Sequence, residues 1–188
     1  MKYKNLFLGL SAVLVWLIIY VVLPKTNLNS DKLIVTKASP GYYLVTKVYD
    51  GDTISVNMDG REEKIRMIGV DTPETHKPNS PVECYGQQAS DFTKQQLSEQ
   101  EVKLEPDPLN QNRDRYQRLL RYVYTKDGRL FNAELVKQGY GFAYLSFPFS
   151  KAEEFRILQS EAKANNLGIW AGECTVTDEN GRNKTNKL

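Results

Sequence analysis

Two short segments of the chain carry the residues best suited to chemistry. The first is Tyr-Asp-Gly-Asp-Thr at residues 49–53, and the second is Arg-Met-Ile-Gly-Val-Asp-Thr-Pro-Glu-Thr at residues 66–75. Asp52 and Asp71 offer the carboxylate oxygens that a hard cation such as calcium prefers. Glu74 is a nearby acid that can serve as a general base. These residue types together indicate metal-assisted hydrolysis, although either aspartate alone would be an ordinary turn or strand-end residue.

Two arginines are candidates for binding a phosphate. Arg66 lies on the strand before Asp71, and Arg118 lies in an arginine-rich stretch. A guanidinium offers a planar fork of donors that suits a phosphate. Arg66 shares a strand face with two apolar residues, so an arginine on the exterior of the sheet is the alternative. With a metal and a base, phosphate-binding arginines would indicate cleavage of a phosphodiester.

Other catalytic arrangements are disfavoured. His76 is the only histidine, and we interpret it as a loop residue because Glu74 already supplies a base. One histidine and two distant cysteines do not make a four-ligand zinc site. The sequence shows neither a glycine-rich phosphate loop nor a Ser/His/Asp pattern.

A predicted β-hairpin carries the acidic segments. Residues 42–48 are rich in β-branched and aromatic types, and residues 53–58 alternate apolar and polar side chains. Both patterns favour strands. Asp59-Gly60 is a typical two-residue hairpin turn, after which residues 64–70 form the returning strand.

Asp52 and Asp71 do not face each other in a flat hairpin. The turn sets a register that pairs residue 52 with residue 67, four residues short of 71. Four residues span about 13 Å along a strand. The two carboxylates therefore meet only if the sheet curls or bulges, as in a barrel.

The rest of the pattern predicts an α+β domain. Two further strands, at 102–105 and 118–125, bring the total to about five, the number of a small Greek-key barrel. Three helices are expected, at 85–98, at 131–138 and after residue 150, where Ser-Lys-Ala-Glu resembles a capping box.

The charge balance excludes nucleic-acid binding by bulk charge. The net charge of +2 comes from Lys2 and Lys4, because residues 1–24 contain no acid. The remainder of the chain carries 23 acidic and 23 basic residues. Any site for a polyanion must therefore be a local patch.

The N-terminus is a hydrophobic run from Leu6 to Leu23. Its eighteen residues, at 1.5 Å each, extend about 27 Å, close to the thickness of a bilayer core. We interpret residues 1–24 as an uncleaved membrane anchor, because no small-x-small cleavage site follows; a cleaved secretory signal is the alternative. Lys2 and Lys4 favour a cytoplasmic N-terminus and a domain outside the cell.

Three segments follow this N-terminal helix. Residues 25–40 are polar and are interpreted as a linker. Residues 41–174 form the folded domain. Residues 175–188 contain almost no apolar residues, and we expect them to be disordered.

Cys84 and Cys174 are the two cysteines. In an extracellular domain an even number of cysteines favours a disulfide, although two unrelated thiols are the alternative. A bond would close a loop of about 90 residues and stabilise the fold. We expect it to leave calcium affinity nearly unchanged, because neither cysteine is near the acidic segments in sequence.

Further motifs follow the acidic segments in a consistent order. They are Tyr-Gly-x-x-Ala-Ser, Asp-x-Tyr-x-Arg-x-Leu, Asn-x-x-Leu-Val-x-Gln-Gly and Leu-Gly-Ile-Trp. Over about residues 42–171 the chain resembles the staphylococcal nuclease (thermonuclease) family. The two acidic segments are the most specific part of this resemblance, and the later motifs support it by order and spacing.

The resemblance implies a fold and a metal site. The fold is a five-stranded OB-type β-barrel with three helices, here preceded by the N-terminal transmembrane or signal helix. The metal is a single calcium ion (Ca2+), held by Asp52 and Asp71 together with the carbonyl of Thr72. Glu74 matches the general base that acts on water.

The resemblance also implies how substrate is bound. Arg66 and Arg118 match arginines that stabilise the charged transition state. Arg115 and Tyr116 occupy the stretch that contacts the nucleotide, and Tyr144 matches the first of two tyrosines that line the pocket. Members of this family cleave DNA and RNA, and leave a 3′-phosphate and a 5′-hydroxyl.

The sequence departs from the family pattern at two places. Gln117 replaces the usual glycine before Arg118, which bears on the angle of that loop. The second pocket tyrosine is replaced by Ser146 or Phe147, depending on a gap of one residue. This change weakens base stacking and leaves the metal ligands and the base in place.

The leading interpretation is a calcium-dependent extracellular endonuclease anchored in the cell membrane by a single pass, or secreted if the signal is cleaved. DNA and RNA are the expected partners, together with the membrane. No protein partner is inferred, and a monomer is expected. The alternative is a catalytically idle OB-fold module that binds nucleic acid at the cell surface. The complete set of acids and arginines argues against this alternative.

Overall fold

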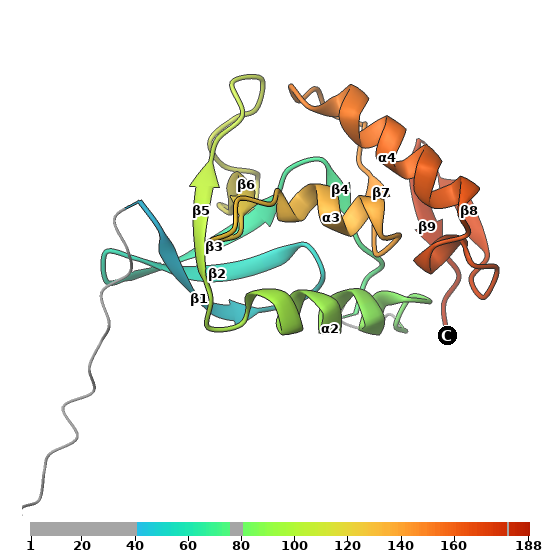
Figure 1. The fold of residues 1–188 in the computed structure, drawn as a ribbon, viewed down its shortest axis with the longest axis horizontal. Coiled ribbons are helices and arrows are strands. Elements are labelled where there is room, and N and C mark those ends of the chain that lie inside the picture. Colours follow the sequence, from blue (N-terminus) through green and yellow to red (C-terminus); the bar gives the residue numbers. More distant parts are fainter. Residues whose placement is uncertain (1–40, 76–80, 180) are drawn as a thin grey trace, which may run out of the picture. The chain divides into compact units, whose positions relative to one another are not determined.

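A computed structural model describes residues 41–75, 81–179 and 181–188 (Figure 1). The predicted N-terminal helix at 1–24, the linker at 25–40 and the loop residue His76 lie outside these ranges. Within them, no helix is both long enough and apolar enough to cross a membrane.

Five strands form a closed barrel in the order β1-β2-β3-β6-β5. Their bounds are β1 Tyr43–Val48, β2 Thr53–Met58, β3 Arg61–Met67, β5 Glu101–Glu105 and β6 Leu119–Tyr124. The predicted hairpin turn is confirmed, because Asp59 and Gly60 both have positive φ angles, of 53° and 85°, as a type I′ turn requires. The predicted register is also confirmed, since Thr53 pairs with Arg66.

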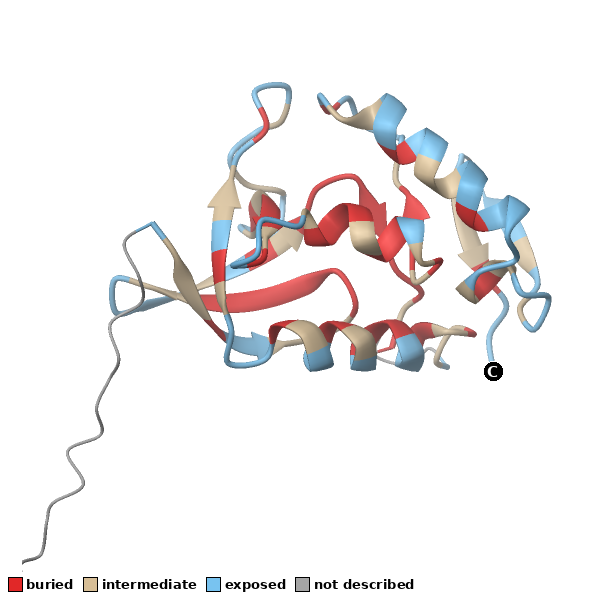
Figure 2. Ribbon diagram, in the orientation of Figure 1, coloured by how far each residue is buried: buried red, intermediate tan, exposed pale blue. Residues whose placement is uncertain are grey.

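The barrel interior is filled by apolar side chains that alternate along the strands. Ile54 and Val56 of β2, and Ile65 and Met67 of β3, are almost completely removed from solvent. Figure 2 shows β2 and most of α3 as buried, whereas much of α4 is exposed. Burial of each such aliphatic side chain contributes roughly 1.5–3 kcal/mol, so the barrel is a rigid platform for the residues at its ends.

The three predicted helices are present: α2 Gly86–Leu97, α3 Phe131–Lys137 and α4 Ala152–Ala164. Two of them hold segments that flank the acidic residues. In α3, the side chain of Asn132 accepts from the Val123 amide at 2.8 Å and donates to the Ile68 carbonyl at 2.9 Å. In α2, the Thr93 hydroxyl donates to the Gly51 carbonyl at 2.7 Å.

The capping box predicted at residue 150 is wrong. The residue that caps α4 is Lys151, and its side chain makes no capping hydrogen bond. Ser150 instead donates to the carboxylate of Asp107, through its amide at 2.8 Å and through its hydroxyl. The serine is therefore used to satisfy a buried acid in another part of the chain.

The chain leaves the barrel immediately after β3. Gly69 has a φ of +77°, and a Cβ atom there would lie 2.6 Å from the ring of Phe149. Only glycine suits both the backbone angle and the space. Past this turn, the short strand β4 (Val70–Asp71) pairs antiparallel with β7 (Phe142–Ala143), outside the barrel.

The prediction that residues 175–188 are disordered is wrong. After the short helix η1 (Gly168–Trp170), strands β8 (Val176–Glu179) and β9 (Arg182–Thr185) form an antiparallel hairpin. Hydrogen bonds join the end of the chain to the segment before α2: Cys84 donates to the Asn186 carbonyl at 2.8 Å, and Leu188 donates to the Val82 carbonyl at 2.9 Å. The hairpin is held by polar contacts that a count of apolar residues does not reveal.

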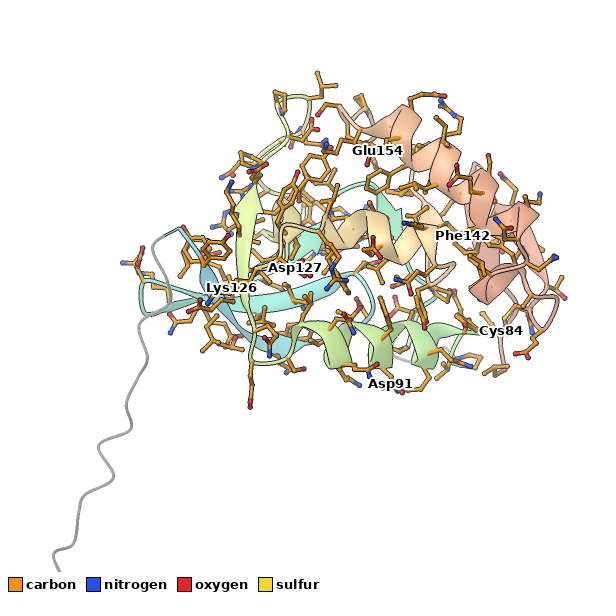
Figure 3. All side chains as sticks on the ribbon, in the orientation of Figure 1. Cys84, Asp91, Lys126, Asp127, Phe142 and Glu154 are labelled. Carbon is orange, nitrogen blue, oxygen red and sulfur yellow. A yellow bond between two sulfur atoms is a disulfide. The ribbon has the colours of Figure 1, made fainter. Side chains whose placement is uncertain are left out.

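Cys84 and Cys174 form a disulfide that joins residues 90 positions apart. Cys84 lies just before α2, where it is labelled in Figure 3, and Cys174 lies two residues before β8. The bond therefore fastens the start of the C-terminal hairpin to the start of the first helix of the domain.

Candidate metal and phosphate site

Asp52 lies at the end of the loop between β1 and β2 and is 5% exposed. Its amide donates to the Asp50 carboxylate at 3.1 Å, and its carbonyl accepts from the Met67 amide at 3.0 Å. A Cβ atom on Gly51 would lie 2.6 Å from the Thr72 side chain. The glycine between Asp50 and Asp52 therefore lets Thr72 pack directly against this loop.

Thr72 brings the second acidic segment to the first. Its amide and its hydroxyl both donate to Oδ2 of Asp52, at 2.8 and 3.1 Å. Asp71 is the adjacent residue, fixed by the pairing of β4 with β7, where its register partner is Phe142 (labelled in Figure 3). The sheet curls into a closed barrel, as the offset of four residues required, and a sharp turn after β3 completes the approach of the two acidic segments.

Arg66 joins the two carboxylates. Its Nε lies 3.2 Å from Oδ1 of Asp52, and its Nη2 lies 3.0 Å from Oδ1 of Asp71. Its Nη1 donates to the carbonyls of Met67 and Val70, at 2.8 and 2.7 Å. The side chain is only 13% exposed, so Arg66 does not extend its charge into solvent as a snorkelling arginine would. In this structure Arg66 organises the acidic residues.

The electrostatics of the cluster favour a positive charge. Burial raises the pKa of Asp71, an effect that Arg66 opposes and the neighbouring Asp52 reinforces. Burial and the charge of Asp52 raise the pKa of Asp50 to about 7. Burial would lower the pKa of Arg66, but Asp52 and Asp71 raise it above its usual value. The close carboxylates thus disfavour one another's charged forms and are relieved by cations.

Sequence reasoning missed Asp50 and Arg182. Asp50 stands two positions before Asp52 in the first acidic segment, and this proximity was a usable signal. Arg182, on β9, donates from Nε to Oδ2 of Asp71 at 2.6 Å and from Nη2 to Oδ1 at 2.9 Å. No pattern in the sequence pointed to Arg182, because its partner lies 111 residues away.

Glu74 lies on the loop that follows Asp71 and is partly buried. Its amide donates to the Glu83 carboxylate at 2.9 Å, and its carbonyl accepts from the Glu83 amide at 2.9 Å. The Glu74 carbonyl would also lie 2.9 Å from a Cβ atom on Gly86, the first residue of α2. The backbone of this candidate base is thus fixed against the segment that leads into the first helix.

Arg118 lies in the turn before β6 and is bound by Asp114. Its Nε donates to Oδ2 of Asp114 at 2.7 Å, and its amide donates to Oδ1 at 3.0 Å. Gln117 before it has a φ of 65°, an angle that glycine adopts without strain. The replacement of the usual glycine is therefore accommodated with the turn intact.

The candidate nucleotide-contacting residues form two groups. Arg115 donates to the Tyr116 hydroxyl at 2.7 Å, and the guanidinium of Arg118 lies 5.4 Å from the Tyr116 ring centre. Tyr144, which follows β7, belongs to the second group, because the guanidinium of Arg182 lies 5.8 Å from the centre of the Tyr144 ring. Arg182 contacts both Tyr144 and Asp71, so Tyr144 is linked to the acidic cluster. Tyr116 is grouped with Arg118.

The oxygen donors present fit a calcium ion. Asp52 and Asp71 supply buried carboxylates, and Thr72 supplies a hydroxyl within hydrogen-bond distance of Asp52. Calcium accepts carboxylate, hydroxyl, carbonyl and water oxygens in flexible geometry. The carboxylates already attract two guanidinium groups. Among the residues that the structure describes, no three His, Cys, Asp or Glu side chains form a metal-binding group.

Comparison with known proteins places these features in context. A model of the family described as staphylococcal nuclease homologues matches residues 64–172. A thermonuclease of Staphylococcus intermedius is 44% identical over 167 residues, which cover 85% of this chain and 96% of that protein. A thermonuclease of Staphylococcus hyicus is 47% identical over 138 residues, covering 72% and 79%. Endonuclease YncB of Bacillus subtilis is 41% identical over 134 residues, covering 70% and 63%.

Proposed function

The chain belongs to the staphylococcal nuclease family, and we propose that it is a calcium-dependent nuclease that hydrolyses DNA and RNA to 3′-phosphate and 5′-hydroxyl ends. The observation that carries this proposal is the buried cluster in which Arg66 joins Asp52 to Asp71. The relatives named thermonuclease and endonuclease support the nuclease class.

In this proposal Asp52, Asp71 and Thr72 hold the metal. Bound there, calcium would supply a Lewis acid that neutralises charge on the scissile phosphate. Arg66 keeps the two carboxylates in position through its contacts with both. Glu74 accepts a proton from the attacking water, and its fixed backbone limits the positions that its carboxylate can reach.

Arg118 stabilises negative charge on the phosphate in the transition state. Its guanidinium is held through Nε by Asp114, which orients the rest of the planar group. Tyr116 is 64% exposed and offers a face on which a base can stack. Arg115 and Tyr144 complete the proposed substrate contacts, with Arg115 already bound to the Tyr116 hydroxyl.

We place the nuclease domain outside the cell, anchored by residues 1–24 or secreted after their removal. The apolar run from Leu6 to Leu23 and the lysines before it support this placement. The Cys84–Cys174 disulfide is compatible with an oxidising compartment. We expect a monomer.

A digestion assay tests the proposed activity. Purified full-length protein is incubated with DNA and with RNA, in calcium and in EDTA, and the product ends are labelled with and without phosphatase treatment. We expect cleavage only with calcium, and 5′-hydroxyl ends that accept label directly. A protein that binds single strands but leaves both substrates intact would instead be the idle binding module.

A further inference from the structure

Arg182, in the C-terminal hairpin, binds the carboxylate of Asp71. Both oxygens are engaged, because Nε donates to Oδ2 at 2.6 Å and Nη2 donates to Oδ1 at 2.9 Å. This bidentate geometry is the strongest that an arginine makes with a carboxylate. Asp71 is 6% exposed, whereas the Arg182 side chain is 42% exposed, so only the carboxylate side of the pair is shielded from the screening that weakens surface ion pairs.

Little of the Asp71 carboxylate is left for another cation. Its Oδ1 already accepts from Arg66 at 3.0 Å in addition to Arg182. A carboxylate has about four lone-pair positions, and three of them are directed at the two guanidinium groups. The positive charge of Arg182 would also repel a metal ion that bound the same carboxylate. Arg182 and a metal therefore compete for the same carboxylate.

Several contacts hold Arg182 in place. The Cys84–Cys174 disulfide fastens the chain just before β8. The Thr185 hydroxyl donates to the Cys84 carbonyl at 2.8 Å, three residues after Arg182. The guanidinium also lies 5.8 Å from the ring centre of Tyr144. These contacts indicate that the hairpin delivers the arginine to this position.

We propose that Arg182 is a built-in competitor of the metal at Asp71, so that the C-terminal hairpin inhibits the site until the metal displaces its arginine. The inference rests on the proposed role of Asp71 as a metal ligand. It gives the disulfide-fastened hairpin a function in setting how much calcium the enzyme requires.

Calorimetric titration of full-length Arg182→Gln with calcium chloride tests this competition. Glutamine removes the charge and the bidentate fork, and we expect calcium affinity to rise about tenfold, within the usual range of coupling between sites. Lys184→Gln is the matched control, because Lys184 lies on the same strand and pairs with Glu179 within the hairpin. Its calcium affinity should equal that of the wild type.

A spectroscopic measurement on the wild type avoids any effect of substitution on folding. The Nε–H group of Arg182 is hydrogen-bonded to Asp71 at 2.6 Å in this structure, so its NMR signal should exchange more slowly with solvent in EDTA than that of an unbound arginine. We expect calcium to abolish this protection. Persistent protection at saturating calcium, or unchanged or weaker calcium affinity in Arg182→Gln, would overturn the proposal and make Arg182 a positioning residue for Asp71.

The outcomes separate this inference from the proposed function. Tighter calcium binding in Arg182→Gln without nuclease activity in any variant would support the competition and overturn the nuclease assignment. Nuclease activity with equal calcium affinity in both proteins would do the reverse. If neither protein binds calcium, both the competition and the metal role of Asp71 are overturned.

Discussion

Arg66 links Asp52 to Asp71, with contacts of 3.2 and 3.0 Å from one guanidinium to the two carboxylates. Asp52 comes from the loop between β1 and β2, Asp71 comes from the strand that follows the turn out of the barrel, and Arg66 on β3 contacts both. It supports the local fold and the site at once, because two backbone carbonyls of that turn accept from the same side chain.

Arg66→Lys should therefore lower stability and activity together. An ammonium keeps the charge but cannot reach two carboxylates and two carbonyls from one point, so the loss should approach but not exceed the roughly 3–5 kcal/mol that removal of one partner of a buried ion pair costs. Denaturant unfolding and DNA digestion measure the two effects. Arg118→Lys is the comparison: its pair with Asp114 is more exposed than the Arg66 cluster, at 23% and 17% of the two side chains, and involves a single carboxylate, so this variant should lose less stability and still lose activity. Equal stability of the two variants would contradict this reading of Arg66.

Glu74→Gln should reduce turnover by at least about 100-fold, the usual scale for loss of a general base. Calcium affinity should change less, since Glu74 acts on water in the proposed reaction. Turnover from single-substrate kinetics and calcium affinity from calorimetry give the comparison. Near-normal turnover would remove Glu74 from the mechanism.

The barrel and its helices could be predicted from the sequence because they depend on local patterns. The alternation in β2, the Asp59-Gly60 turn and the spacing of apolar residues in the helices all act over a few residues. The turn also sets the register of the hairpin. The separation of Asp52 and Asp71 in a flat sheet therefore follows from the sequence. The two acids are brought together by the turn at Gly69 and by the hydrogen bonds from Thr72 to Asp52.

The rest of the site depends on contacts between distant residues. Arg182 reaches Asp71 across 111 positions, and Ser150 satisfies Asp107 across 43. Each is a polar residue in a segment whose local pattern indicates something else, a disordered tail or a helix cap. Such pairings depend on the folded barrel as a template, and one sequence carries no local signal for them.

Activity should require calcium, and magnesium should replace it poorly. Asp52, Asp71 and Thr72 offer a small number of oxygen donors with unequal surroundings, which suits the flexible coordination of calcium better than the strict octahedron of magnesium. Digestion rates with each ion, after dialysis against EDTA, test this. Equal rates with magnesium alone, or full activity in EDTA, would contradict the proposed site.

Asp107 should make stability depend on pH in the acidic range. Burial would raise its pKa, but hydrogen bonds from Ser150 and Tyr122 lower it to about 2, below the usual 3.8. A carboxyl with a depressed folded-state pKa stabilises the fold above its unfolded pKa, and this contribution is lost as the pH falls toward 2. The Tyr122 hydroxyl lies 2.6 Å from Asp107.

Asp107→Asn should therefore cost about 1–3 kcal/mol near pH 7, and the difference from the wild type should shrink as the pH falls below about 4. Urea unfolding across this range measures it. Tyr122→Phe removes one hydrogen-bond donor to Asp107, so the free energy of unfolding should change less with pH than in the wild type. A difference that stays constant down to about pH 2 would show that Asp107 is not the group responsible.

Reduction of the Cys84–Cys174 disulfide should change calcium binding as well as stability. In sequence the cysteines are distant from the acids, and that distance predicts an unchanged affinity. In the structure the bond fastens the hairpin that carries Arg182 to Asp71. Loss of the cross-link should cost about 4–5 kcal/mol in the chain-entropy model and free the hairpin, so that calcium binds more tightly.

The effect of reduction should depend on Arg182. We expect reductant to raise calcium affinity in the wild type and to leave it unchanged in Arg182→Gln, because the competing charge is already absent there. Double Cys84→Ser/Cys174→Ser protein provides the same comparison without reductant, and melting in EDTA gives the stability change separately. Equal gains in affinity with and without Arg182 would show that the disulfide acts on the metal site by a route other than this arginine.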